Sequence, residues 1–257
     1  MSRNVSVAER RDEGGWFETI KVIVQALAIA LVIRTLLFQP FNIPSGSMIP
    51  TLLIGDYVFV SKYAYGYSNY SIPFGPDLFS GRIMASAPKR GDVVVFKLPR
   101  DNETDYIKRV IGLPGDRVQM IEGRLYINGV IVPREPKAKE RTENREGRET
   151  EVPTYTETLP GGVAHTIIEI EGDRGINDNT ELVVVPPNHY FVMGDNRDNS
   201  TDSRISAELG GVGLVPFENL VGRAEIIFFS VQKDASALAF WRWPWTVRWD
   251  RLFKPAH

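Results

Sequence analysis

The sequence of 257 residues lacks cysteine, which excludes disulfides, thiolate metal sites and a cysteine nucleophile. Its three histidines occur in no metal-binding spacing and in no recognisable Ser-His-Asp context. Glycine-rich phosphate-binding motifs and the Gly-x-Ser-x-Gly motif of hydrolase-fold esterases are also absent. A formal net charge of -2 argues against non-specific binding of nucleic acid. We therefore expect neither a metal nor a cofactor, and no nucleic-acid partner.

One long apolar segment, residues 16–38, lies near the N-terminus. As a helix it would extend roughly 34 Å, enough to cross the apolar core of a bilayer. A buried core helix and a cleavable secretion signal are the alternatives, and Ala28-Ile29-Ala30 resembles a signal cleavage site. Strongly apolar residues continue to Phe38, beyond any cut there, so we predict an uncleaved transmembrane anchor.

The distribution of basic residues predicts the orientation of this anchor. Lysine and arginine are absent between Gln39 and Ser61. The basic residues that precede or open the apolar segment are Arg3, Arg10, Arg11 and Lys21. Residues 1–15 are therefore expected in the cytoplasm, with everything after Phe38 outside.

Beyond Pro40 short β signals are frequent and helical periodicity is scarce, which predicts a mostly β protein with antiparallel strands. Turn signals such as Asn128-Gly129 separate the strands. The predicted strands are residues 57–62, 92–98, 106–111, 117–121, 124–127, 163–170, 181–185, 190–193 and 221–230.

Residues 133–160 carry charges of both signs and almost no large apolar side chain, so they should contribute little to a core. We predict an exposed, inserted β subdomain at 133–185, with 39–132 and 186–257 forming the main β domain. Four tryptophans and several arginines interleave at 241–249, a composition that suits lipid headgroups and ordinary packing equally well.

Ser47 is a candidate nucleophile in the segment IPSGSM, residues 43–48. Pro44 and Pro50 restrict the backbone on both sides. Such a loop can present one hydroxyl outward while the Ser47 amide and the Ser45 hydroxyl point toward one oxygen, as in an oxyanion hole. A plain turn is the commoner meaning of Ser-Gly-Ser beside prolines, so the loop alone does not identify a nucleophile.

Lys108 lies in a predicted strand, on the same face as Tyr106 and Val110. Apolar surroundings would lower its pKa and leave a neutral amine able to take a serine proton. A solvated lysine on an edge strand is the alternative. Ser86 and Lys89 match the Ser-x-x-Lys motif, but they lie in a turn-forming context and lack the companion motifs of β-lactamase-like enzymes.

A third feature is the polar loop at 194–204, which directly follows an apolar strand and could orient a catalytic side chain. Asp198, Ser200 and Asp202 alternate as in a calcium loop. The glycine and the downstream glutamate of such a loop are missing, and arginines already supply positive charge. A solvated turn is the remaining alternative.

The segments PSGSM, YIKRVIGLPGD and GDNRDNSTDSR, in this order behind an anchor, resemble the type I signal peptidases of bacteria. The resemblance implies that Ser47 is the nucleophile, Lys108 the general base, Ser45 an oxyanion donor and Ser200 the hydroxyl that orients the lysine. Further implied roles are ion-paired support by Arg109, Asp202 and Arg204, and a shallow apolar substrate pocket formed by Phe41, Ile43, Pro44, Leu52 and Ile107.

The same resemblance implies a serine endopeptidase that removes signal peptides from exported preproteins at Ala-x-Ala-like sites. Its expected place is the bacterial cytoplasmic membrane, as a single-pass protein with the catalytic domain on the outer, periplasmic face. Expected partners are preproteins, the phospholipid bilayer and the secretion translocon. Another Ser/Lys peptidase, such as a self-cleaving repressor, and an inactive anchored β module that binds a partner are the rival readings.

Overall fold

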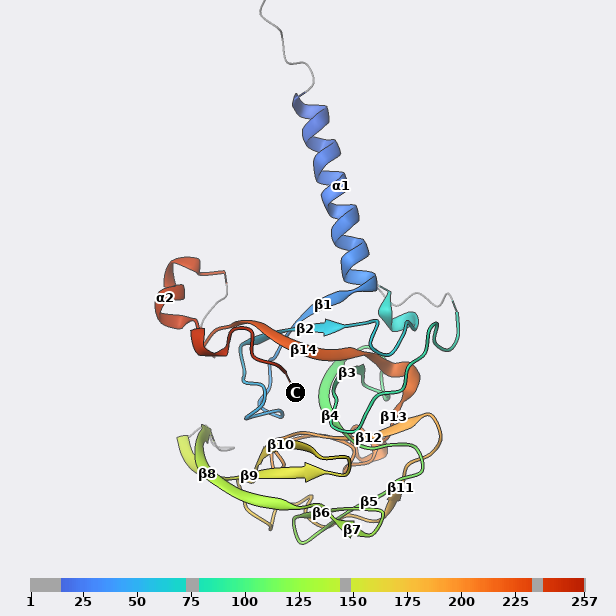
Figure 1. Ribbon diagram of the computed structural model, residues 1–257, viewed down its shortest axis with the longest axis vertical. Helices are drawn as coiled ribbons and strands as arrows, with labels where there is room; N and C mark the ends of the chain where they lie inside the picture. Colours follow the sequence, from blue (N-terminus) through green and yellow to red (C-terminus); the bar gives the residue numbers. More distant parts are fainter. Residues whose placement is uncertain (1–14, 73–78, 144–148, 233–237, 257) are drawn as a thin grey trace, which may run out of the picture.

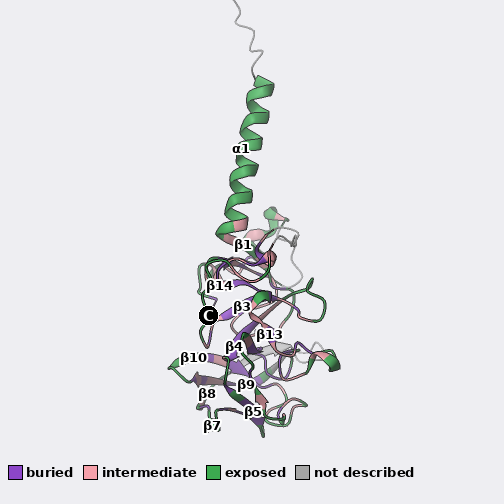
Figure 2. Ribbon diagram, turned by 90° about the vertical axis from the view of Figure 1, so that its right-hand side faces the viewer, coloured by how far each residue is buried: buried purple, intermediate pink, exposed green. Residues whose placement is uncertain are grey.

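The computed structural model describes residues 15–72, 79–143, 149–232 and 238–256. A single helix, α1 (Gly15–Leu36), extends away from a β-rich domain (Figure 1). None of its residues is buried, as Figure 2 shows by its colour, and its apolar stretch has a mean hydropathy of 1.9. Within the described residues it is the one helix long and apolar enough to cross a membrane. The basic residues of the extreme N-terminus, Arg3, Arg10 and Arg11, lie outside the described residues.

The helix ends two residues earlier than expected, because Phe38 already belongs to a strand. Phe38 pairs with Ser61 across an antiparallel ladder, and its ring packs edge-on against Tyr63 with 5.6 Å between centroids. The chain therefore passes from α1 into the sheet through Leu37 alone.

The largest sheet has seven strands in the order β1-β2-β14-β3-β4-β12-β13, and all of its neighbouring strands are antiparallel. Its strands are β1 (Phe38–Asn42), β2 (Asp56–Ser61), β14 (Leu220–Ser230), β3 (Val93–Lys97), β4 (Asp105–Gly112), β12 (His189–Met193) and β13 (Val215–Pro216). The prediction of a mostly β, antiparallel fold with one N-terminal helix is confirmed, and every predicted strand is present.

Two smaller sheets lie at the end of the domain farthest from α1 (Figure 1). One contains β11 (Val183–Val184), β5 (Arg117–Ile121), β6 (Arg124–Ile127) and β7 (Val130–Ile131). The other contains β10 (Val163–Ile168), β9 (Glu149–Leu159) and β8 (Arg134–Glu143).

The expectation that residues 133–160 contribute little to a core needs correction. In β9, Val152, Thr154, Glu157 and Leu159 are all at least 98% buried. Leu159 joins Val118 and Phe191 in one hydrophobic cluster. Alternation along a strand hides these inward-facing side chains among outward-facing charges. We keep 133–185 as the proposed insertion, packed on the main domain rather than separate from it.

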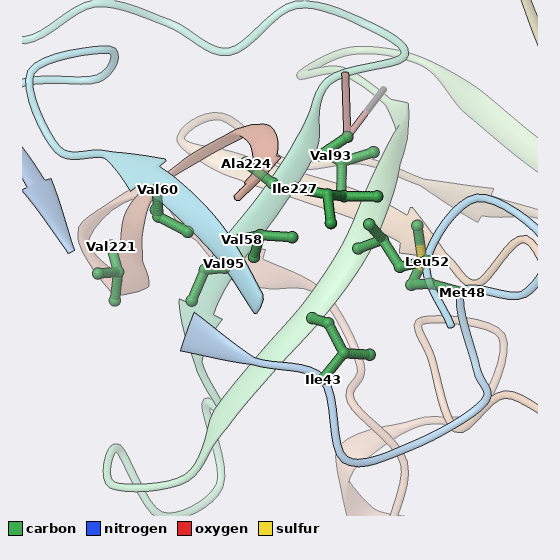
Figure 3. Close-up of a cluster of buried hydrophobic side chains, with 11 residues drawn as sticks. Ile43, Met48, Leu52, Val58, Val60, Val93, Val95, Val221, Ala224 and Ile227 are labelled. Carbon is green, nitrogen blue, oxygen red and sulfur yellow. The ribbon is translucent and has the colours of Figure 1, made fainter. Parts of the chain in front are cut away.

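A buried cluster joins the Ser47 segment to the large sheet (Figure 3). Ile43, Met48 and Leu52 come from the loop between β1 and β2, which also carries Ser47, and they pack on strand residues such as Val58 and Ile227. Burial of each of these five apolar side chains contributes roughly 1.5 to 3 kcal/mol to the stability of the folded state. The backbone on both sides of Ser47 is therefore fixed to the sheet.

The C-terminal segment contains only short helices and packs along β14. Trp243 packs on Phe229 with ring centroids 4.9 Å apart, whereas Trp241, Trp245 and Trp249 are exposed. Both sequence readings of the tryptophans therefore stay open. The short helices of this segment are η4 (Phe240–Arg242), α2 (Trp243–Thr246) and η5 (Trp249–Arg251). Three others lie earlier in the chain: η1 (Asn69–Ser71), η2 (Ala207–Leu209) and η3 (Phe217–Asn219).

Candidate active site

Ser47 lies in the loop between β1 and β2 and is 7% exposed. Two hydrogen bonds from Asn196 hold this loop: its backbone N–H donates to the Ser47 carbonyl oxygen at 3.1 Å, and its side-chain amide donates to the Gly46 carbonyl at 3.1 Å. The polar loop at 194–204 thus fixes the position of the serine that the sequence singles out.

Lys108 lies in β4, an interior strand of the seven-stranded sheet between β3 and β12. Its side chain is 3% exposed, so the alternative of a solvated edge lysine is wrong. Lys108 Nζ donates hydrogen bonds to Ser47 Oγ at 2.7 Å and to the Ile107 carbonyl at 2.9 Å. The amine and the hydroxyl are therefore in direct contact.

Burial lowers the pKa of Lys108 from 10.5 to about 8, because the ammonium loses its hydration. Asp202 and Asp195 oppose this shift by attracting the positive charge. An appreciable fraction of neutral amine therefore exists near neutral pH, and a neutral amine in hydrogen-bond contact can accept the serine proton.

Ser47 and Lys108 open into a cleft of about 600 Å³. Ser45, Pro44 and Ile107 also line this cleft, and Ser45 is exposed to it. The other predicted substrate-pocket residues lie elsewhere. Phe41 lines a second cleft of about 500 Å³, and Ile43 and Leu52 are 2% and 0% exposed in the cluster of Figure 3. The pocket made of all five residues stays a prediction.

The remaining predicted residues lie around the contact between Lys108 Nζ and Ser47 Oγ. Ser200 lines the cleft, and its buried hydroxyl has no hydrogen-bond partner among the described residues, including Lys108. A side chain on Gly194 would overlap both Ser200 Oγ and the Ser47 carbonyl oxygen, so only glycine fits there. The Arg204 guanidinium donates to both carboxylate oxygens of Asp202 at 2.9 Å.

Arg109 belongs to a buried network that the sequence only partly indicates. It donates to Asp195 through two bonds of 2.8 and 2.7 Å, and both side chains are 1% exposed. Burial works to raise the pKa of Asp195, but the guanidinium outweighs it and holds that pKa below its ordinary value. Arg109 also donates to Thr51, which lies in the same loop as Ser47, between β1 and β2.

Glu157 is the site-supporting residue that sequence reasoning missed. From β9 it binds the Arg197 guanidinium of the polar loop, and His165 lies 3.5 Å away. Burial lowers the pKa of His165 to about 4, so this histidine is neutral near pH 7. Glu157 stands between Thr156 and Thr158 at the end of a polar stretch, and no local sequence signal indicates that its partner is a distant arginine.

Comparison with known proteins identifies one family. The model of the family "Signal peptidase, peptidase S26" matches residues 16–229. Signal peptidase I of Rickettsia conorii is 43% identical over 249 residues, covering 89% of this chain and 88% of the relative. That of Rickettsia typhi is 42% identical over 255 residues, covering 89% of each.

A solved signal peptidase I from Enterococcus faecalis is 27% identical, and the match covers 54% of this chain and 97% of that one with a TM-score of 0.31. This structural overlap is low, and the sequence matches over most of the chain are the informative ones.

Replacement of Arg109 by methionine should strand the Asp195 carboxylate in the interior. We expect the free energy of unfolding to fall by about 3 to 5 kcal/mol, the cost of breaking a buried ion pair from one side. Lys254→Met breaks the exposed pair with Asp250 and should cost less than about 1 kcal/mol. Denaturant unfolding of the purified variants measures both, and equal losses would contradict a special role for the buried pair.

Proposed function

The chain belongs to the signal peptidase I family, peptidase S26, and from that premise we propose that Ser47 and Lys108 are the dyad with which it removes signal peptides. The family is one of serine endopeptidases. The single observation that carries the assignment is the 2.7 Å contact between Lys108 Nζ and Ser47 Oγ, both buried at the wall of an open cleft.

In the proposed mechanism, neutral Lys108 takes the proton of Ser47 Oγ as that oxygen attacks the carbonyl carbon of the scissile bond. The resulting ammonium returns the proton to the leaving amine when the carbon–nitrogen bond breaks, which leaves an acyl ester on Ser47. Water then attacks the ester, Lys108 takes a proton from it, and Ser47 Oγ leaves with that proton. No histidine is needed, which agrees with the low pKa of His165, about 4, and with its contacts to Glu157 and Arg197.

Ser45 is proposed to stabilise the oxyanion of the tetrahedral intermediate together with the Ser47 amide. Its exposed position on the same cleft as Ser47 supports this role. Ser200 is proposed to orient Lys108 on substrate binding, since its hydroxyl lies buried at the cleft with no other partner among the described residues.

The membrane anchor places the site where the substrate is. Only β1 and the start of the next loop separate α1 from Ser47, so even an extended chain would span less than about 40 Å between them. The apolar part of a signal peptide occupies the same bilayer, so enzyme and scissile bond are confined to one plane. We propose that the domain faces the outer side of the bacterial cytoplasmic membrane, where it acts beside the translocon.

We further propose cleavage after Ala-x-Ala-like sequences. Pro44 and Ile107 at the wall of the cleft offer apolar contacts of the kind that small apolar side chains would make. Incubation of the detergent-solubilised enzyme with an Ala-x-Ala preprotein, followed by N-terminal sequencing of the product, tests this. Self-cleavage alone would support the repressor-like rival, and an intact preprotein would support the inactive module.

Ser47→Ala and Lys108→Met should each reduce preprotein cleavage to background while the thermal unfolding midpoint shows that the fold persists. The chain provides its own matched controls, because Ser86 and Lys89 are a serine and a lysine that are both exposed. Ser86→Ala and Lys89→Met should keep wild-type turnover. Near wild-type turnover in Lys108→Met would remove the proposed base.

Ser45→Ala should lower kcat by roughly 10²- to 10³-fold, the cost of one oxyanion donor, with little change in KM. Thr201 supplies the control, since its exposed hydroxyl lines the same cleft. Thr201→Ala should leave kcat within about twofold of wild type. An unchanged kcat in Ser45→Ala would exclude its hydroxyl from the oxyanion site.

The pH profile should report the ionisation of Lys108. Since the lowered pKa is about 8 and only the neutral amine accepts a proton, kcat/KM should rise about tenfold per pH unit below 8 and level off above it. Initial rates with a peptide substrate between pH 6 and 10 measure this rise. A profile that is flat across that range would be incompatible with a lysine base.

A further inference from the structure

Three buried carboxylates gather behind the wall of the active-site cleft, outside the dyad. Glu169 follows β10, Asp178 lies between β10 and β11, and Asp198 belongs to the polar loop. Their exposed fractions are 0%, 0% and 6%. One oxygen of each lies within 4.8 Å of the others. Such close approach of three acidic groups in the interior requires a compensating partner.

Backbone contacts hold the three carboxylates together. Asp198 Oδ2 accepts a hydrogen bond from the Glu171 amide at 2.7 Å, and Asp178 Oδ2 accepts one from the Gly175 amide at 2.6 Å. A side chain on Gly175 would overlap Asp198 Oδ1. Segment 169–178 thus contacts the polar loop closely, with the carboxylates of Glu169 and Asp178 turned inward.

The contacts among the described residues leave part of this cluster unsatisfied. Glu169 Oε2 and Asp178 Oδ1 are fully buried and have no hydrogen-bond partner there. A buried carboxylate oxygen without a donor or a cation is costly, and native proteins rarely leave one so. These two oxygens therefore point to a ligand.

The guanidinium groups of Arg134, Arg197 and Arg204 mainly bind other carboxylates, although Arg204 Nη1 has no hydrogen-bond partner among the described residues. Arg197 binds Glu157 and Arg204 binds Asp202, each through two nitrogen atoms. Arg134 makes two bonds of 2.9 Å to Asp173 and reaches Glu169 only at 3.4 Å. Arginine therefore compensates the cluster incompletely.

The pKa values of the three carboxyl groups agree with this incomplete compensation of their negative charge. Burial, reinforced by Asp198 and Asp178, raises the pKa of Glu169 to about 8, against the attraction of Arg197 and Arg134. Burial also raises the pKa of Asp178 and of Asp198, although Arg204 lowers both.

We propose that Glu169, Asp178 and Asp198 bind one hard divalent cation of the calcium class. Two oxygens bound to one calcium ion at about 2.4 Å can lie at most about 4.8 Å apart, and the three carboxylates meet this limit. A set of oxygen ligands without sulfur or imidazole selects calcium or magnesium over zinc and copper.

This site differs from the linear loop of Asp198, Ser200 and Asp202 that the sequence suggests and then disfavours. Asp202 is committed to Arg204, and the additional ligands come from a segment distant in the sequence. Ile176 and Asn177 of that segment line the catalytic cleft beside Ser200. The cation would therefore tie one cleft wall to the loop that contacts the Ser47 segment.

Calcium binding is measured on the full-length protein in detergent after chelator treatment and dialysis. Isothermal titration calorimetry with calcium chloride should show one site per chain. At a calcium concentration 100 times Kd, the midpoint of thermal unfolding should rise by about 5 to 10 °C. Neither measurement depends on peptidase activity, so loss of the proposed dyad would leave this result intact.

Glu169→Gln and Asp178→Asn should each weaken calcium binding more than about tenfold and remove most of the thermal shift, because each deletes one ligand charge. Asp250→Asn is the matched control: it removes an exposed acidic group that pairs with Lys254 and lies outside the three ligands, and it should keep the full shift. Absence of binding heat and of a thermal shift in the wild type at millimolar calcium would overturn the proposal. A full shift in both ligand variants would overturn it as well.

Discussion

The withdrawal of one amine from water is the constraint on which the rest of the structure depends. Lys108 reaches Ser47 only because an interior strand carries it beneath the loop that follows β1, where almost no solvent remains. Burial lowers the pKa of Lys108 to about 8, so part of the amine is neutral near pH 7, and only this neutral form could accept a proton. The sheet around β4 and the cluster below the Ser47 loop both serve to hold this contact.

Around that contact, charged residues are buried in pairs that connect separate parts of the chain. Arg109 on β4 binds Asp195 of the polar loop, and Arg197 of that loop binds Glu157 in β9, part of the hairpin formed by β8 and β9. Each pair costs desolvation and recovers it through bidentate geometry. Such pairs tolerate little displacement, so they determine relative position more than net stability. The β8–β9 hairpin, which the sequence predicts to be exposed, thereby fixes the polar loop. The polar loop in turn binds the backbone at Gly46 and Ser47.

Periodic and local signals were readable from the sequence, whereas contacts between distant charged residues were not. The anchor, the strands and the approach of Ser47 to Lys108 follow from apolar runs, alternation and a strongly patterned set of motifs. Strand β9 was hidden because its buried positions mix Thr154 and Glu157 with the apolar Val152 and Leu159. In β8, residues 134–139 have no buried side chain to reveal a pattern. The partner of Glu157 is 40 residues away, beyond any local pattern.

Two arginines of the segment 238–256 bind the loop that carries Ser47. Arg251 donates to the Thr51 carbonyl at 3.0 Å, Arg248 donates to the Ile54 carbonyl at 2.7 Å, and both bind Asp56 at the end of that loop. The ribosome makes these two arginines 200 and 194 residues after the residues whose carbonyls they bind. The loop that carries Ser47 therefore lacks these supports while all the residues in between are being made.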